Sequence, residues 1–557
     1  MKNVTLLFAA LIVAIATSAN AAERLSAHAI ATAHPLATQA GHEILAQGGN
    51  AFDAAVAVTA ALAVVEPYSS GIGGGGFWLL HRARDGKQVM LDGRERAPLA
   101  AHRDLYLDEQ GEVIPKLSVD GPLAAGIPGV PAALEHLARD YGRLPLAKSL
   151  APAIRLAREG FPVDKHYRRL ATFRLEPLRA SPAARAQFLV DGEVPASGFG
   201  LRQPDLAATL ELVAQQGAKG FYSGVTAKRL VEGVRAAGGI WRLEDLSRYR
   251  VVERAPIRGS YRGYRVIAAS PPSSGGVVLM QILNQLARMD AGRQGVALRR
   301  HLMIESMRRA YRDRALYLGD PDFVTMPIVR LLSPAYTERL TASVDRTRAT
   351  PSSALPGVRP EAEGPHTTHF SILDREGNRV AATLSINYPF GSGFVPPGTG
   401  VLLNDEMDDF SAKPGVPNVY GLVGAEANAI APGKRMLSSM TPAFVENDER
   451  LAILGTPGGS RIITMVLQGV LSFVEGGDAE TIVSRGRIHH QYLPDVVQAE
   501  PGALTESEVI ALRQLGHRVQ VRDRTWGNMQ AITLDRVSGV IDAASDPRGI
   551  GAAEVRR

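Results

Sequence analysis

Two adjacent threonines, Thr367 and Thr368, stand between a polar stretch and a strand-like run at residues 370–373. If the chain is cut just before Thr367, that residue carries both a hydroxyl nucleophile and a free α-amine that can serve as its base. The reference pKa of an α-amine is about 7.7–8.0, so much of it is neutral near pH 8 and can accept the hydroxyl proton. Threonine is also common at the start of strands, so the pair alone leaves a structural interpretation open.

The flanking sequence favours a precursor that is cut at this point. Residues 345–364 contain three prolines and several small or polar residues, a composition typical of an exposed linker. After the threonines, a turn at residues 374–378 separates the first strand from a second one at residues 380–387. The bond between His366 and Thr367 therefore lies at the end of a predicted tether, directly before a strand.

Three other segments carry charged, hydroxyl-bearing or glycine residues in a distinctive order. They are Asp-Gly-Arg-Glu-Arg-Ala-Pro at 92–98, Leu-Asn-Asp-Glu-Met-Asp-Asp-Phe-Ser at 403–411, and Leu-Ser-Ser-Met-Thr-Pro at 437–442 followed by Gly-Thr-Pro-Gly-Gly-Ser-Arg at 455–461. Together with Thr-Thr-His at 367–369, they resemble the γ-glutamyltransferase family, also called γ-glutamyltranspeptidase or glutathione hydrolase. The resemblance covers essentially the whole chain after the first two dozen residues.

The alternation of helical and strand-like segments allows either an α/β or an α+β layered fold. The family resemblance implies an α+β fold, the four-layer αββα sandwich of N-terminal-nucleophile hydrolases. It also implies a large subunit at residues 22–366 and a small subunit at 367–557, which stay interlocked as one globule after self-cleavage.

The resemblance implies a set of catalytic residues around Thr367, the nucleophile. Ser385 occupies the position where the family commonly has a threonine that hydrogen-bonds the amine of the nucleophile. Serine keeps that hydroxyl and loses only the methyl group. Gly458 and Gly459 form a glycine pair whose backbone N–H groups can approach a reacting centre closely and stabilise an oxyanion.

A γ-glutamyl group presents an α-carboxylate and an α-ammonium side by side, and the implied binding residues suit both. A guanidinium fork with two hydroxyls fits the carboxylate, two carboxylates spaced i, i+3 share a face and fit the ammonium, and an amide adds an acceptor. A tyrosine in a loop that resembles the lid of some bacterial members is the implied gate. Arg94 supplies the guanidinium, and Ser438 and Ser439 supply the hydroxyls. The two carboxylates are Glu406 and Asp409, the amide is Asn387, and the tyrosine is Tyr420.

The implied activity is that of an exported γ-glutamyltransferase that cuts itself at His366–Thr367 and then passes γ-glutamyl groups to water, amino acids or peptides. No cofactor or metal is implied. Two alternatives remain: a glutaryl or cephalosporin acylase of the same superfamily, whose acyl group lacks the α-ammonium, and an exported binding protein that does not cleave itself.

The N-terminus has the features of a secretory signal peptide. Lys2 precedes a short apolar run at residues 4–16, and Ala19 and Ala21 form an Ala-x-Ala cleavage site. The run is too short to span a bilayer comfortably. We therefore predict cleavage after Ala21 and a periplasmic or secreted protein without a stable membrane anchor. The chain has no cysteine, which fits export without a disulfide framework.

Composition excludes some function classes. The net charge is only +6, and the basic residues are scattered, as in the arginine-rich stretch 308–314, which we expect to be a solvated surface rather than a nucleic-acid site. The run Gly-Ile-Gly-Gly-Gly-Gly at 71–76 follows an Ala-rich helical segment at 54–65 instead of a strand, so it does not predict dinucleotide binding. Adjacent His489 and His490 should point to opposite faces and be structural.

Overall fold

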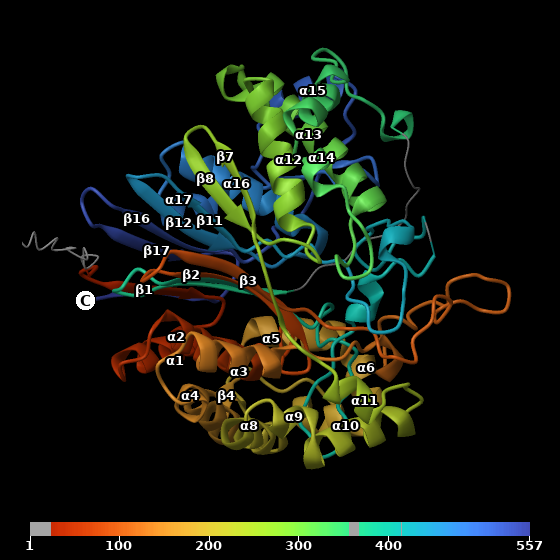
Figure 1. The fold of residues 1–557 in the computed structure, drawn as a ribbon. Helices are drawn as coiled ribbons and strands as arrows, with labels where there is room; N and C mark the ends of the chain where they lie inside the picture. The colour runs from red at the N-terminus through yellow and green to blue at the C-terminus, as the bar shows by residue number, and fades with distance from the viewer. Residues whose placement is uncertain (1–23, 356–366, 414) are drawn as a thin grey trace, which may run out of the picture.

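The computed structural model describes residues 24–355, 367–413 and 415–557. Two antiparallel sheets lie face to face, with one layer of helices against the outer face of each (Figure 1). This arrangement confirms the predicted four-layer αββα sandwich. Within the described ranges, no helix has both the length and the apolar character needed to cross a membrane.

The first sheet has seven strands in the order β18-β1-β9-β10-β2-β3-β6. All of its neighbouring strands are antiparallel. Its strands are β1 (His28–Thr32), β2 (Gly75–Arg82), β3 (Lys87–Gly93), β6 (Val252–Arg254), β9 (Thr368–Leu373), β10 (Arg379–Ser385) and β18 (Ala552–Arg556).

The second sheet has six strands in the order β17-β16-β12-β11-β8-β7, again all antiparallel. Its strands are β7 (Ile257–Tyr261), β8 (Tyr264–Ala268), β11 (Ala443–Glu446), β12 (Arg450–Gly455), β16 (Gln530–Asp535) and β17 (Ile541–Ser545). Since the sheets combine strands from both sides of residue 367, the two predicted subunits are interleaved in one globule.

Helices from the first half of the chain cover the first sheet, and later helices cover the second (Figure 1). The first layer comprises α1 (Pro35–Ala46), α2 (Ala51–Val65), α3 (Val130–Asp140), α4 (Leu146–Glu159), α5 (Lys165–Phe173), α6 (Leu175–Ala180), α7 (Pro182–Phe188), α8 (Pro204–Gln216), α9 (Lys219–Tyr222), α10 (Gly224–Ala236) and α11 (Leu243–Ser247). The second comprises α12 (Gly275–Arg288), α13 (Val296–Tyr317), α14 (Ile328–Leu331), α15 (Pro334–Ala342), α16 (Ile462–Val474), α17 (Ala479–Ser484) and α18 (Glu506–Gln514).

Helix α2 contains the Ala-rich helical segment that the sequence predicted at residues 54–65. Asn50 caps it, and a capping box with Asp53 satisfies the first N–H groups. The helix ends at Val65, with Glu66 as the C-cap before Pro67. Every one of its residues is buried, as expected for a helix that is apolar on all sides.

The two predicted strands after the threonines are present as β9 and β10, but the second ends two residues early. We predicted that it would extend to Asn387, whereas β10 stops at Ser385. Asn387 adopts a left-handed backbone conformation with φ of 71°, which no strand residue can have. The chain therefore turns away from the sheet directly after Ser385.

One expectation about exposure was wrong. Arg308 and Arg309, expected on a solvated surface, are 2% and 1% exposed, because α13 packs in the core and both guanidinium groups contact the carboxylate of Glu305. The expected linker is mostly exposed over its described residues 345–355, as predicted, with a few residues packed against the protein. Ser352 is buried, and its backbone N–H donates to Asp495 Oδ2 at 2.7 Å. The rest of that segment, residues 356–366, lies outside the described residues.

The interface between the sheets contains a small polar cluster beside the start of β9. His369 is fully buried, with Nδ1 2.8 Å from the hydroxyl of Thr383 and Nε2 3.3 Å from that of Ser371. Ser371 in turn donates to the carbonyl of Ile453 in the second sheet. Burial lowers the pKa of His369 from 6.5 to about 3, so the folded protein keeps this imidazole neutral.

This shift makes stability depend on pH in a definite direction. The contribution of neutral His369 is fully present above pH 6.5 and is lost as the pH falls towards 3, because the unfolded chain binds the proton first. Between pH 7.5 and 4.5 the unmutated protein should lose about 2–3 kcal/mol more unfolding free energy than a His369→Gln variant. Urea unfolding at the two pH values measures this difference, and equal losses in both proteins would contradict the assignment.

Candidate active site

The ends of neighbouring strands bring three predicted site residues to one edge of the first sheet, namely the edge at which β9 begins and β10 ends. In an antiparallel sheet the start of one strand lies beside the end of its neighbour. Here Thr368 at the start of β9 pairs with Leu384 near the end of β10, and Gly76 at the start of β2 pairs with Gly93 at the end of β3. Thr367, Ser385 and Arg94 directly adjoin these ends, so they share the edge.

The second sheet also brings predicted site residues together at the ends of its strands. Ala443 at the start of β11 pairs with Leu454 near the end of β12. Ser438 and Ser439 lie in the segment that enters β11, and Gly459 opens the short 3-10 helix that follows β12. The site therefore lies where these strand ends of the first and the second sheet meet.

The glycine run before β2 allows this close packing. A Cβ at Gly74 would lie 2.2 Å from the carbonyl oxygen of Ser385, and one at Gly73 would lie 2.1 Å from that of Leu402. Only glycine permits such an approach. The run thus serves the packing of the site, in agreement with our rejection of a dinucleotide loop.

A small pocket lies at this junction, and every predicted site residue except Gly458 lines it. The lining comprises Arg94, Thr367, Ser385, Asn387, Glu406, Asp409, Tyr420, Leu422, Ser438, Ser439, Met440, Gly459 and Ile462. Gly458 lies directly before the lining residue Gly459, and the two have φ values of 143° and 55°. Residues other than glycine rarely adopt either φ value.

Tyr420 closes one side of the cavity. Its hydroxyl donates to the backbone carbonyl of Asn387 at 2.7 Å, and its ring lies against Gly459, where a Cβ would come within 2.6 Å of the ring. The Asn387 N–H donates to the Ser385 hydroxyl at 2.7 Å. The loop tyrosine, the glycine pair and the end of β10 are therefore held together.

Arg94 is the centre of a buried ionic cluster. Its Nη1 contacts Glu406 and its Nη2 contacts Asp409, both at 2.5 Å, while its Nε donates to the carbonyl of Met436. Glu406 and Asp409 occupy the two ends of a single 3-10 turn, so the predicted i, i+3 spacing does put both carboxylates on one side. We expected Arg94 and the acids to act on different substrate groups, and here they also pair with one another.

The cluster holds more acids than cations. Glu95 lies 3.5 Å from Arg94, and the buried Arg314 donates to the hydroxyl of Ser439. Glu95, Glu406 and Asp409 thus lie around the guanidinium of Arg94. Burial raises the pKa of Glu406 to about 7, against the opposing effect of Arg94, and raises that of Glu95 well above its usual range. A bound ammonium would favour the ionised form of Glu406.

Sequence reasoning missed the apolar wall of the cavity and Arg314. The wall consists of Leu422, Met440 and Ile462, which carry no chemistry that a motif would single out. Arg314 belongs to the arginine-rich stretch that we expected at the surface. Its hydrogen bond to Ser439 becomes visible only when α13 is seen to be buried.

A sequence model described as gamma-glutamyltranspeptidase matches residues 37–555. The chain belongs to the γ-glutamyltranspeptidase family. It is 43% identical to the glutathione hydrolase proenzyme of Escherichia coli (strain K12), over 94% of this chain and 90% of that protein. The family resemblance seen in the motifs is confirmed, and this chain is an enzyme of the family.

Solved structures of the γ-glutamyltranspeptidase family and of acylases share the fold. A cephalosporin acylase from Bacillus halodurans superposes with a TM-score of 0.83 at 30% identity, covering 95% of this chain and 96% of that one. The γ-glutamyltranspeptidase of Helicobacter pylori superposes with a TM-score of 0.57 at 42% identity, covering 58% of this chain and 93% of that one. The predicted fold is thus confirmed independently.

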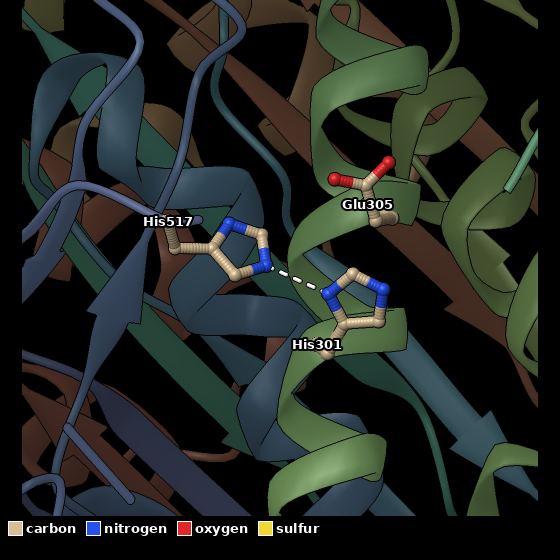
Figure 2. A group of neighbouring side chains, drawn as sticks. All are labelled: His301, Glu305 and His517. Carbon is tan, nitrogen blue, oxygen red and sulfur yellow. Dashed lines mark hydrogen bonds between the residues drawn. The ribbon is translucent and has the colours of Figure 1, made fainter. Parts of the chain in front are cut away.

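One histidine–carboxylate group lies outside this family site. His301, Glu305 and His517 have ligand-type atoms within 4.8 Å of one another, and Figure 2 shows the two imidazoles bonded to each other beside Glu305. The Glu305 carboxylate already pairs with Arg308 and Arg309. Two guanidinium groups beside the cluster oppose a divalent cation, so we assign it a structural role in holding α13 to its neighbours.

His489 and His490, predicted to be structural, have separate partners. His489 contacts the hydroxyl of Thr464 and the amide of Gln491, whereas His490 contacts Asp495. Both imidazoles are buried, and burial lowers the pKa of each. The two rings act in different polar networks, in line with the expectation that they face opposite ways.

Proposed function

We propose that this chain is an exported γ-glutamyltransferase and glutathione hydrolase that cuts itself between His366 and Thr367. The observation that carries the proposal is that Thr367 shares one small cavity with the buried cluster of Arg94, Glu406 and Asp409. Cleavage would give a large subunit of residues 22–366 and a small subunit of residues 367–557. His366 itself lies outside the described residues.

Self-cleavage requires no group beyond the chain and water. The Thr367 hydroxyl attacks the carbonyl carbon of His366, the peptide C–N bond breaks, and the acyl group moves from nitrogen to oxygen. Water then hydrolyses the ester, which leaves a carboxylate on His366 and a free α-amine on Thr367. That amine is the base for the next reaction.

In the mature enzyme the amine accepts the Thr367 hydroxyl proton while the oxygen attacks the γ-carbonyl of the donor. We assign the backbone N–H groups of Gly458 and Gly459 to the oxyanion, a contribution worth roughly 2.7–4 kcal/mol per donor in comparable sites. The donor's amine leaves with a proton, and a γ-glutamyl ester remains on Thr367. Water or an acceptor amine resolves the ester, with Ser385 orienting the amine of the nucleophile.

The charge pattern supports a γ-glutamyl donor. Arg94 uses three of its five N–H donors in the cluster and keeps two for a substrate carboxylate, with Ser438 and Ser439 beside it. Glu406 and Asp409 take the ammonium, while Asn387 and Tyr420 close the site.

Replacing Arg94 by lysine tests the carboxylate role. Lysine keeps the charge but loses the fork that holds two oxygens. We expect the KM for a γ-glutamyl donor to rise on the order of tenfold or more while self-cleavage continues. Steady-state kinetics on the cleaved variant measure this, and an unchanged KM would show that Arg94 does not bind the substrate.

A cephalosporin or glutaryl acylase is the second candidate, favoured by the close superposition on the Bacillus halodurans acylase. A glutaryl group has no α-ammonium, so Glu406 and Asp409 would have no substrate partner. An assay with glutathione and a γ-glutamyl anilide, with and without glycylglycine, tests the main proposal directly. A denaturing gel separates both enzymes from an uncleaved binding protein, since only cleavage gives two bands.

Export is part of the proposal. Residues 1–21 lie outside the described residues, and the support comes from the sequence pattern of the signal peptide. N-terminal sequencing of the large subunit, purified from the periplasm or the medium, should begin at Ala22. A mature chain that retains residues 1–21 would contradict the assignment.

A further inference from the structure

Helix α2 and strand β9 are joined by a side-chain hydrogen bond at each end. At one end the Ala51 N–H donates to Asp374 Oδ2 at 2.9 Å, and at the other the Thr368 hydroxyl donates to Glu66 Oε2 at 2.6 Å. The 15 residues of α2 span about 22 Å, and the six of β9 span about 20 Å. The rigid helix thus matches the strand in length and is fixed to both of its ends.

The bond to Glu66 reaches the strand from the face opposite the cavity. Successive side chains of a strand point to opposite faces. Phe370 and Ile372 pack into the same core as α2, and Thr368 shares their face, while Ser371 bonds to the second sheet. Thr367 therefore points towards the sheet interface and the cavity, and Glu66 holds its neighbour from behind.

Glu66 is a carboxyl that the proposed mechanism does not use. It is 3% exposed, and it also accepts a hydrogen bond from the Tyr68 hydroxyl at 3.3 Å. The other charged or titratable groups that face this pair are Asp164, Arg169 and His166, whose ring lies against Tyr68. Glu66 is the C-cap residue of α2, so its carboxyl lies at the negative end of the dipole of that helix.

We propose that Glu66 is a positioning residue for the self-cleavage of this chain: by holding the Thr368 hydroxyl, it fixes the backbone of Thr367 against the bond that is cut. The inference rests on the proposed function, because it presumes that Thr367 is the nucleophile. A misplacement of about 1 Å can cost on the order of a hundredfold in rate. A rigid helix fixed at both ends of β9 prevents such a displacement.

The state of the Glu66 carboxyl gives the proposal a pH signature. Burial raises the pKa of Glu66 to about 7, so the group ionises near neutral pH. The ionised form accepts a stronger hydrogen bond from Thr368. Self-cleavage should therefore speed up as the pH rises through 7. Before cleavage the Thr367 nitrogen is an amide, so its later titration as an amine does not interfere.

The experiment follows conversion of newly made precursor into two subunits by pulse-chase and denaturing gel, from pH 5.5 to 8.5. Glu66→Gln and Thr368→Val should each slow conversion roughly tenfold or more, and the double variant should be no slower than the slower single one. Thr368→Ser keeps the hydroxyl and should restore nearly the full rate. The pH response near 7 should flatten in Glu66→Gln. Burial also raises the pKa of Glu406 and of Asp408 to about 7, but both acids are intact in that variant, so a flattened response is due to Glu66.

Asp313→Asn is the matched control. Asp313 is a buried carboxyl with a raised pKa that accepts from the Tyr336 hydroxyl and the Gln281 amide and also pairs with Arg312, but it lies on α13, in the layer against the other sheet. Its loss should lower the melting temperature without slowing conversion or changing its pH response. Three results would each overturn the proposal. They are conversion of Glu66→Gln at the wild-type rate, additive slowing of conversion in the double variant, and slowing by Asp313→Asn equal to that by Glu66→Gln. Two bands from Thr367→Ala would instead overturn the proposed function.

Discussion

Replacing Thr367 by alanine is expected to leave one uncut precursor without any γ-glutamyl transfer activity. The alanine side chain has no nucleophile for the His366 carbonyl, so neither the ester nor the free α-amine can form. Both the attacking oxygen and its base are lost in one substitution, and activity should fall to the background rate. A denaturing gel and an assay with a γ-glutamyl anilide measure the two effects on the same sample.

A serine at this position provides the control for that experiment. Thr367→Ser keeps the hydroxyl and the future amine, so it should still cut, more slowly, and regain activity as the two bands appear. The loss of the methyl group frees the rotamer of the hydroxyl. If the alanine variant still yielded two subunits, the scission would lie elsewhere and Thr367 would not be the nucleophile.

The predicted site residues could be selected from the sequence because they lie at strand ends and in short motifs. Thr367 precedes β9, and Arg94 follows β3, and both positions are set by local pattern. The antiparallel order of β9, β10, β2 and β3 then brings them to one edge. No motif states that order, so the family resemblance was needed to foresee that these residues share a cavity.

What the sequence could not provide was the pairing of buried charges. Arg308 and Arg309 resemble surface residues in composition, yet they are buried because α13 packs in the core, where both pair with the carboxylate of Glu305. Likewise, the direct contact of Arg94 with Glu406 joins residues 312 positions apart. Charge pairing over such separations depends on tertiary packing, which periodicity and propensity do not encode.

The same limit applies to residues that act through others. No role for Glu66 was predicted from the sequence, and only the position of α2 beside β9 connects it to Thr368. The glycine run at 71–76 had a similar status until its distances to Ser385 and Leu402 were known. Both examples concern the backbone around the nucleophile, where small displacements alter the geometry of attack.

The acid pair leads to the second large expected effect, a strong preference for glutathione over a glutaryl amide. The glutaryl group is the same acyl chain without the α-ammonium. A buried site built around a charged partner rejects an analogue that lacks it, by a factor often on the order of 10⁴, because its own polar groups are left unpaired. Here Glu406 and Asp409 would remain buried beside Arg94 without the ammonium.

Removing one acid should erase most of this discrimination. Asp409→Ala is expected to lower kcat/KM for glutathione by a factor of roughly 10² or more and to leave turnover of the glutaryl amide nearly unchanged. Asp408→Ala is the matched control, because this neighbouring acid contacts Ser118 and the Val419 N–H and does not line the cavity. It should affect both substrates alike. Comparable kcat/KM values for glutathione and the glutaryl amide in the unmutated enzyme would refute the ammonium site and favour the acylase, since only an acylase has no use for two carboxylates facing its acyl group.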